Sequence, residues 1–447
     1  MTRPVSPRVL VLLGIVVLFS FSQLVDIETF TGKHVSVVDQ LQSAQIFSLS
    51  DQYNSSQDRE DNIWKHHNRH TLSALLTCLL LENCRPNQDK LVILEDWDYM
   101  QAYSGTPGGE RIWSRSVLRT FDLLGISYAY ARDLSFVQSI YSMFPNQTKA
   151  ILLSQQDLEA CWNDWGCVMD GKNTLGLPIE LLYSAQFFGH KGGNPFGAKW
   201  TITPEKYDYT DPETYIGYSI EEECAVAPII PHHERPKQVW VLGKHTTYLS
   251  SSHFPYSRDI FQKASAKLGV EFVGAFDSWN GEEASTMPGL RNLLLAPGSH
   301  HLNKEEFEQQ LKNSLAIVGL HDPLVSPTPW YGLCFGTPFI NPAEISVDGQ
   351  GHSHVRDSQH FTAGALGEPH VYNVERYNDE AFISNLRRAI QPHDRFIPPF
   401  MRQSVLSRRV LDWIDSDKKS LLQKRIASDE KWLKVLTDKW FLKEMYI

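Results

Sequence analysis

The sequence predicts an α/β protein with two parallel-sheet domains, because short apolar runs alternate with segments of helical periodicity. In the first half, 91–94 reads as a buried strand, and apolar residues within 112–124 recur at near-helical spacing. The second half repeats this order, with strands expected at 239–242 and 316–318. The 447 residues are about three times the ~150 of one domain, which fits two domains with additional segments.

Local signals also predict several helix boundaries. Gly125 and Gly269 each follow the last periodic residue of an expected helix, where glycine readily takes a left-handed conformation. Asn303 and Glu306 have the spacing of a capping box, which predicts the start of a helix that leads into the strand at 316–318.

The composition excludes two broad classes of protein. There are 42 Lys+Arg and 52 Asp+Glu, a net charge of -10, so no nucleic-acid partner is expected. Hydrophobic residues make up 42% of the chain, with 12 Trp and 17 Tyr, which is too much apolar surface for a disordered protein.

An uncharged segment near the N-terminus, 9–25, predicts a single transmembrane signal anchor. Arg3 and Arg8 lie in an expected cytosolic tail, 1–8, and Asp26 follows the span, which favours a type II membrane protein with a lumenal body. A cleaved signal peptide is the alternative, although the segment ends without a clear small-residue cleavage site. The span is short, so the Golgi or the endoplasmic reticulum is the expected membrane, and we favour the Golgi.

A lumenal body would be glycosylated and disulfide-bonded. Asn54 and Asn146 begin glycosylation acceptor sequences. Free buried thiols are the default expectation for Cys224 and Cys334. Two other cysteine pairs, each with a six-residue separation, predict local disulfide loops: Cys78 with Cys84, and Cys161 with Cys167.

The body is expected to fall into four parts after the anchor. The predicted parts are a polar stem, 26–62, an N-terminal Rossmann-like domain, 63–214, a C-terminal Rossmann-like domain, 215–400, and amphipathic C-terminal helices that pack on the body, 401–447.

One candidate base follows from local chemistry. A Gly/Pro-rich turn, 104–110, separates a strand from a helix and puts Glu110 in the first helical turn, at the sheet edge where α/β proteins bind ligands. Glu110 could accept the proton of an attacking hydroxyl, and a helix-start residue is the structural alternative.

Two weaker motifs concern a diphosphate. Asp96 and Asp98 have the D-x-D spacing with which many nucleotide-sugar transferases hold a divalent cation, but Asp415 and Asp417 match it too. Lys244 closes the strand at 239–242, where its ammonium could meet a diphosphate, and a surface lysine is the alternative. Adjacent histidine pairs lack a third ligand, so no metal site is expected.

Six segments together carry a family resemblance, in the order 104–110, 189–200, 215–221, 243–244, 317–342 and 358–371. The most distinctive is Ser-Pro-Thr-Pro-Trp-Tyr-Gly-Leu at 326–333. This set resembles the N-acetylglucosaminyltransferase V family, whose members add β1,6-linked N-acetylglucosamine to the α1,6-mannose arm of N-glycans. The resemblance runs from about Leu91 to Ile414.

The resemblance implies a GT-B architecture, with an acceptor-side and a donor-side Rossmann-like domain facing across a cleft, and catalysis without metal or cofactor. It implies Glu110 as the catalytic base. The implied donor-binding residues are Glu221, Lys244, Pro327, Thr328, Pro329, Trp330 and Tyr331, and the implied acceptor or cleft residues are Lys191, Lys199 and Trp200. Core packing is the alternative for any one tryptophan.

The expected function is therefore inverting, metal-independent transfer of N-acetylglucosamine from UDP-GlcNAc to a mannose hydroxyl of a glycan or glycoprotein. Tyr331 stands where the family has an acidic residue, which leaves two alternatives open. One is a transferase with another nucleotide-sugar donor, with a metal held by Asp96 and Asp98. The other is a membrane-anchored glycan-binding protein without catalysis.

Overall fold

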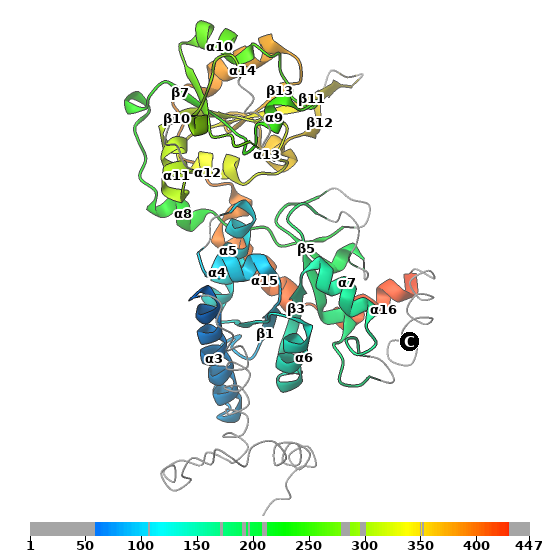
Figure 1. The fold of residues 1–447 in the computed structure, drawn as a ribbon. Helices are drawn as coiled ribbons and strands as arrows, with labels where there is room; N and C mark the ends of the chain where they lie inside the picture. The colour runs from blue at the N-terminus through cyan, green and yellow to red at the C-terminus, as the bar shows by residue number, and fades with distance from the viewer. Residues whose placement is uncertain are drawn as a thin grey trace, which may run out of the picture. The chain divides into compact units, whose positions relative to one another are not determined.

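The computed structural model describes residues 59–428, apart from gaps at 106–107, 170–172, 190–193, 195–196, 208–211, 279–286, 296–300, 349 and 351–352. The chain divides into two units (Figure 1). The first comprises the chain up to Ser104, Phe121–Ala185 and the chain from Ile414, and the second comprises Gly105–Thr120 and Gln186–Trp413. Each unit holds a largely parallel sheet with helices, so the predicted α/β class is confirmed. The predicted domain bounds, and the arrangement across a cleft, stay predictions.

Several sequence predictions fall outside the described residues. The tail, the anchor at 9–25, Asn54 and Lys191 are among them. In the part of the chain that the structure describes, we find no helix of the length and apolarity needed to cross a membrane. The first described helix begins at Arg59, inside the predicted stem.

The first unit is built on four parallel strands in the order β2-β1-β3-β4. They are β1 (Leu91–Leu94), β2 (Ser127–Tyr130), β3 (Thr148–Leu153) and β4 (Leu182–Ala185). Nearly every strand residue is buried, as expected where helices cover both faces of a parallel sheet. The helices are α3 (Arg59–Leu80), α4 (Trp97–Tyr103), α6 (Leu134–Met143), α7 (Gln155–Asn163) and α16 (Lys418–Ser428), with a short 3-10 helix at Ile179–Leu181.

A side chain of α3 hydrogen-bonds to backbone groups of β2, the edge strand of this sheet. The buried amide of Asn68 donates to the carbonyl of Tyr130 at 2.7 Å and accepts from its backbone N–H at 2.8 Å. Because an unpaired buried backbone group is costly, this pairing fixes α3 against β2.

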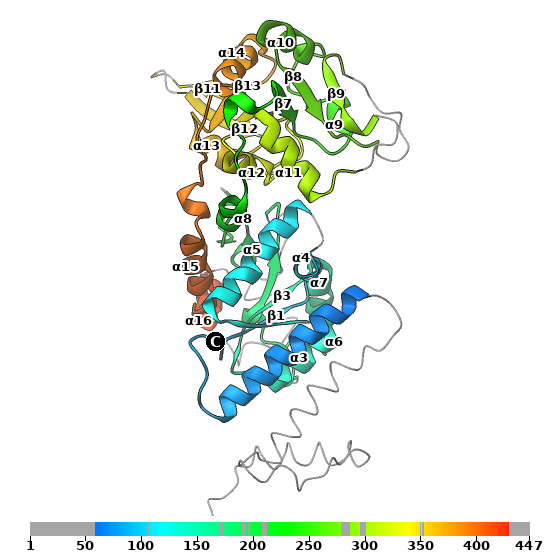
Figure 2. The same cartoon turned by 90° about the vertical axis from the view of Figure 1, so that its left-hand side faces the viewer.

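The D-x-D pattern after β1 has a structural explanation. Asp96 caps α4, because its carboxylate accepts a hydrogen bond of 3.0 Å from the backbone N–H of Asp98. The intervening helix α4 was not predicted. After it comes α5 (Gly109–Leu124), one continuous helix in Figure 2, and Gly125 follows with φ of 72°, which confirms that predicted helix end.

The second unit contains a seven-stranded sheet in the order β12-β11-β10-β7-β8-β9, with β13 also paired to β11. β12 is antiparallel to β11, and the other pairs are parallel. The strands are β7 (Gln238–Val241), β8 (Glu271–Gly274), β9 (Leu290–Asn292), β10 (Ser314–Val318), β11 (Phe339–Val347), β12 (Ser353–Ser358) and β13 (Val371–Glu375). β5 (Thr201–Thr203) and β6 (Thr214–Tyr215) pair in parallel and belong to the six-stranded sheet, not to this one.

Further helices belong to this unit, and buried residues of some of them form an apolar core with strands of the seven-stranded sheet. The helices are α8 (Glu221–Val226), α9 (Thr247–Ser250), α10 (Ile260–Leu268), α11 (Lys304–Asn313), α12 (Thr328–Cys334), α13 (Phe361–Leu366), α14 (Asp379–Ala389) and α15 (Gln403–Ile414). Short 3-10 helices cover Ala198–Trp200, His232–Glu234, Leu293–Leu295 and Pro399–Met401. Both hydrogen bonds of the Asn303–Glu306 capping box are present at 2.9 Å, and Gly269 ends α10 in a left-handed conformation, so both predictions are confirmed.

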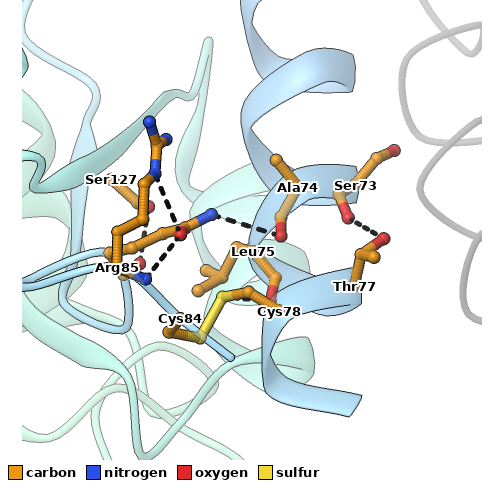
Figure 3. The surroundings of a disulfide bond; sticks show 9 residues. Ser73, Ala74, Leu75, Thr77, Cys78, Cys84, Arg85 and Ser127 are labelled. Carbon is orange, nitrogen blue, oxygen red and sulfur yellow. Dashed lines mark hydrogen bonds between the residues drawn. A yellow bond between two sulfur atoms is a disulfide. The ribbon is translucent and has the colours of Figure 1, made fainter. Parts of the chain in front are cut away.

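All six cysteines form disulfides. Both predicted local loops are confirmed, and Figure 3 shows the Cys78–Cys84 bond at the end of α3. The default expectation of free thiols for Cys224 and Cys334 is wrong, because these residues are bonded and join α8 to α12. A separation of 110 residues gave no sequence signal for this pair.

Candidate functional site

A pocket of about 680 Å³ opens in the second unit. Its wall comes from the loop after β10, from β12 and from the start of α13, together with Phe188 and Tyr207. The other lining residues are Leu324, Val325, His354, Val355, Arg356, Asp357, Ser358, Gln359, Phe361, Gly364 and Ala365. The pocket therefore borders two of the segments that carry the family resemblance, 317–342 and 358–371.

Gln359 joins those two segments. Its side-chain oxygen accepts from the backbone N–H of His321 at 3.1 Å, and its side-chain nitrogen donates to the carbonyl of Pro323 at 3.0 Å. The backbone N–H of Val325 in turn donates to the Gln359 carbonyl at 2.9 Å. Three hydrogen bonds from one buried residue thus hold the loop after β10 in the pocket wall.

Aromatic faces contribute to the wall. Phe188 is 38% exposed and Phe361 is 37% exposed, so each leaves ring surface to solvent. The Tyr207 ring lies 5.2 Å from that of Phe361, and its hydroxyl donates to the carbonyl of Phe187 at 2.6 Å. Exposed rings beside the polar side chains of a pocket suit a sugar or a base, which present both apolar faces and hydrogen-bonding edges.

Trp330, in the predicted donor-binding segment 327–331, belongs to a buried polar cluster with Glu205 and His360. The indole N–H of Trp330 donates to Oε1 of Glu205 at 3.3 Å, and Nε2 of His360 lies 3.8 Å from the same oxygen. Burial raises the pKa of Glu205 to about 7, and burial lowers the pKa of His360 to about 3, since a charge is disfavoured away from water. His360 also caps α13, because Nδ1 accepts from the N–H of Ala363.

The segment 327–331 forms the start of α12 and is largely buried. Thr328, Pro329 and Trp330 pack in the interior, and Trp330 is fully buried. Tyr331 is 5% exposed, and its buried hydroxyl has no hydrogen-bond partner among the described residues. The Tyr331 side chain therefore packs in the core, and its predicted role as a donor contact stays a prediction.

The predicted base lies next to this segment. Glu110 is in the first turn of α5, half-buried, as the sequence predicted. A Cβ added to the preceding Gly109 would lie 3.4 Å from the ring of Pro327, so the start of α5 packs beside that ring. Glu110 and the start of α12 thus come from distant parts of the sequence to one place in the second unit. Glu110 does not line the pocket described above.

Lys244 follows β7 at the carboxyl end of that strand and is exposed, which matches its predicted position. Its carbonyl accepts a hydrogen bond of 2.9 Å from the N–H of Asp277, which ties the turn after β7 to the turn after β8. The ammonium is thereby carried by an anchored turn at the sheet edge.

Glu221 has protein partners. Its carboxylate accepts from Arg402 and from the backbone N–H of Gln403, each at 2.8 Å. The hydrogen bond from Arg402, followed by that from Gln403, lowers the pKa of Glu221. Since α15 begins at Gln403, the carboxylate caps that helix, and its predicted donor contact stays a prediction.

The predicted acceptor-side residues differ in exposure. Trp200 is 1% exposed, so core packing, the alternative given above for any tryptophan, describes both Trp200 and Trp330. Lys199 is exposed, and its carbonyl accepts from the hydroxyl of Thr214 at 2.7 Å. Asn146, the glycosylation candidate in the described part, is exposed in a turn, as an acceptor site requires.

Two residues of this site carry no signal in the sequence. Glu205 follows β5 and carries no motif, and only its three-dimensional contact with Trp330 marks it. Gln359 lies within a segment that carries the family resemblance, but the resemblance implies no role for it. A single buried acid or amide has no periodic or spacing signal, so neither role was predictable from the residues alone.

Comparison with known proteins finds relatives over much of the chain. The chain is similar to an N-acetylglucosaminyltransferase. Identity is 23% over 337 residues to alpha-1,6-mannosylglycoprotein 6-beta-N-acetylglucosaminyltransferase A of Homo sapiens, and the same to that of Mus musculus. The alignment covers 65% of this chain and 42% of the relative, so the chain spans less than half the length of the curated relatives it matches. No protein-family model matches.

Solved structures give weaker likenesses. An alpha,alpha-trehalose-phosphate synthase (UDP-forming) from Burkholderia vietnamiensis has a TM-score of 0.25 at 11% identity, covering 88% of this chain and 84% of that one. An Anabaena protein in complex with UDP and glucose has a TM-score of 0.26 at 9% identity, covering 76% and 98%. TM-scores this low carry no argument about function.

Proposed function

We propose that the chain is an inverting glycosyltransferase that moves N-acetylglucosamine from UDP-GlcNAc to a mannose hydroxyl of a glycan, with a β1,6 linkage on N-glycans. The proposal extends to this chain what the name of its relatives states of them. The observation that carries it is the contact, within the second unit, between three segments that resemble one transferase family: the start of α5 packs on Pro327, and the Trp330 ring of α12 lies 4.9 Å from the ring of His360.

In the proposed reaction, Glu110 accepts the proton of the acceptor hydroxyl as the hydroxyl oxygen attacks the anomeric carbon of the donor. A new C–O bond forms on the face opposite the diphosphate, the bond from the anomeric carbon to the diphosphate oxygen breaks, and UDP leaves with the bonding electrons. Lys244, on its anchored turn, offsets the negative charge that grows on the diphosphate. A lysine in this role removes the need for a metal ion.

The proposed setting is the Golgi membrane, with a single N-terminal anchor at 9–25 and the body in the lumen. The three disulfides support a lumenal body, because an oxidising compartment maintains such bonds. A mannose-containing glycoprotein would be the acceptor there.

One observation favours a second candidate, a transferase with a different nucleotide-sugar donor. The buried Tyr331 occupies the position at which the resembling family has an acidic residue, so the donor contact of that residue is missing here. A panel of UDP- and GDP-sugars separates the two candidates. If UDP-GlcNAc is the one donor of the panel that the enzyme turns over, the N-acetylglucosaminyltransferase is supported. Turnover of a different nucleotide sugar supports the second candidate.

The full chain, purified in detergent, should release UDP from UDP-GlcNAc when a mixed pool of mannose-containing glycans is present. EDTA should leave the rate unchanged. A rate that falls to background in EDTA would contradict the metal-free mechanism, and a rate that does not depend on acceptor would contradict glycosyl transfer.

A further inference from the structure

Three side chains that the proposed reaction does not use meet at the edge of the second sheet. They are His253, in the turn after α9, and His321 and Asp322, in the loop after β10. One ligand atom from each lies within 4.8 Å of the other two. From this cluster we propose that His253, His321 and Asp322 bind a Zn²⁺ ion.

The distances suit the coordination geometry of zinc. Nδ1 of His321 lies 3.4 Å from Oδ2 of Asp322, and Nδ1 of His253 lies 4.0 Å from the same oxygen. Ligand atoms about 2.0–2.1 Å from a tetrahedral zinc ion are ~3.3 Å apart. The first pair already has this spacing, and a small rotation of the exposed His253 ring brings the second pair to it.

A second carboxylate faces the far side of the buried ligand. Nε2 of His321 is buried and has no hydrogen-bond partner among the described residues, but Oδ2 of Asp357 lies 3.8 Å away. Arg376 holds that carboxylate with a hydrogen bond of 2.9 Å. Metal-binding histidines usually direct the other ring nitrogen at a carboxylate, which fixes the ring and strengthens the ligand. Asp357 is placed for this role.

Burial and ligand type favour zinc over the hard cations. The side chain of His321 is 11% exposed and that of Asp322 31%, while His253 is 66% exposed and leaves a path for the ion. Two imidazoles and one carboxylate match the ligand sets of open zinc sites, whereas Mg²⁺ and Ca²⁺ prefer oxygen alone. The six cysteines are all in disulfides, so no thiolate competes for the ion.

The bound ion would link two loops beside the pocket. Residues 321–325 run from two of the ligands to the pocket-lining Leu324 and Val325, and Asp357 lines the pocket too. Zinc would therefore connect the turn after α9 to the loop after β10, beside the pocket.

The test is direct zinc binding by the full chain after removal of metal with EDTA and exchange into metal-free buffer. Zn²⁺ is titrated in competition with a chromophoric chelator, without donor or acceptor. We expect one site per chain, weakened about 10-fold or more in His253→Ala and in Asp322→Asn. Asp357→Asn should weaken binding about 10- to 100-fold, because it removes the supporting carboxylate.

His233→Ala is the matched control. His233 is also an exposed histidine beside a carboxylate, with Nε2 3.6 Å from Glu234, but it has no third ligand within the described part of the chain. Equal zinc affinity in His253→Ala and His233→Ala, no bound zinc, or binding of Mg²⁺ in preference to Zn²⁺ would each overturn the proposal. Since the assay uses no substrate, its failure leaves the transferase proposal untouched, and failure of UDP release leaves the zinc site untouched.

Discussion

The indole nitrogen of Trp330 donates a hydrogen bond of 3.3 Å to the buried carboxyl of Glu205, which ties α12 to the segment after β5. Burial disfavours the charged form of this carboxyl and raises the pKa of Glu205 to about 7. Trp330, in the predicted donor-binding segment 327–331, is therefore held by an acid that is half-protonated near neutral pH.

Glu205→Gln should change how stability depends on pH. In the folded protein Glu205 keeps its proton up to about pH 7, whereas the unfolded chain loses it near pH 4.5, so wild-type stability falls as the pH rises through this window. Gln can still accept from Trp330 and does not titrate. Relative to wild type, the variant's free energy of unfolding should rise by up to about 3 kcal/mol from pH 4.5 to pH 8.

Urea unfolding across this pH range checks the prediction, with Glu159→Gln, an exposed glutamate on α7, as the control. His360, whose pKa burial lowers to about 3, stays neutral in the folded wild-type protein over this pH range, and its titration in the unfolded chain is common to both proteins. A difference that stays constant with pH would show that Glu205 titrates normally.

Glu221→Ala should lower the free energy of unfolding by about 1 kcal/mol, because the carboxylate caps α15 and the exposed pair with Arg402 adds little. Glu222→Ala, which removes a surface pair with Arg119, should change it by less than about 0.5 kcal/mol. Denaturant unfolding measures both. A higher KM for UDP-GlcNAc with unchanged stability would instead support the donor contact that the sequence predicted.

Tyr331→Phe should retain transferase activity and leave stability unchanged or higher by up to about 1 kcal/mol. The variant removes a buried hydroxyl for which the described residues provide no hydrogen-bond partner. Thermal melting and initial rates of UDP release test this. A tenfold loss of kcat/KM at unchanged melting temperature would mean that the hydroxyl contacts substrate.

Removal of the long-range disulfide should lower the free energy of unfolding more than removal of a local one. Chain-entropy arguments give about 5 kcal/mol for the 110-residue separation of Cys224 and Cys334, and about 2 kcal/mol for the six-residue separation of Cys161 and Cys167. Paired Cys→Ala variants compared by urea unfolding test the order. Equal losses would show that unfolded-state entropy does not set the contribution of these bonds.

The features that the sequence predicted depend on neighbouring residues. Asn303 and Glu306 are three residues apart in the chain and form their capping box without help from the rest of the fold. Glu110 was predicted at a helix start for the same reason. By contrast, 125 residues separate Glu205 from Trp330, and 181 separate Glu221 from Arg402. Such pairings are set by packing of whole elements, so no local pattern shows them.

Glu110 is the proposed base of the glycosyl transfer. The most direct test is acceptor-dependent UDP release from UDP-GlcNAc by the full chain and by Glu110→Gln, in EDTA. Glu305→Gln is the control, since Glu305 lies in the first turn of α11 as Glu110 does in α5, but is exposed. We expect a rate for Glu110→Gln at least ~100-fold below wild type, because the general base is lost, and a normal rate for Glu305→Gln. A normal rate for Glu110→Gln would contradict this role.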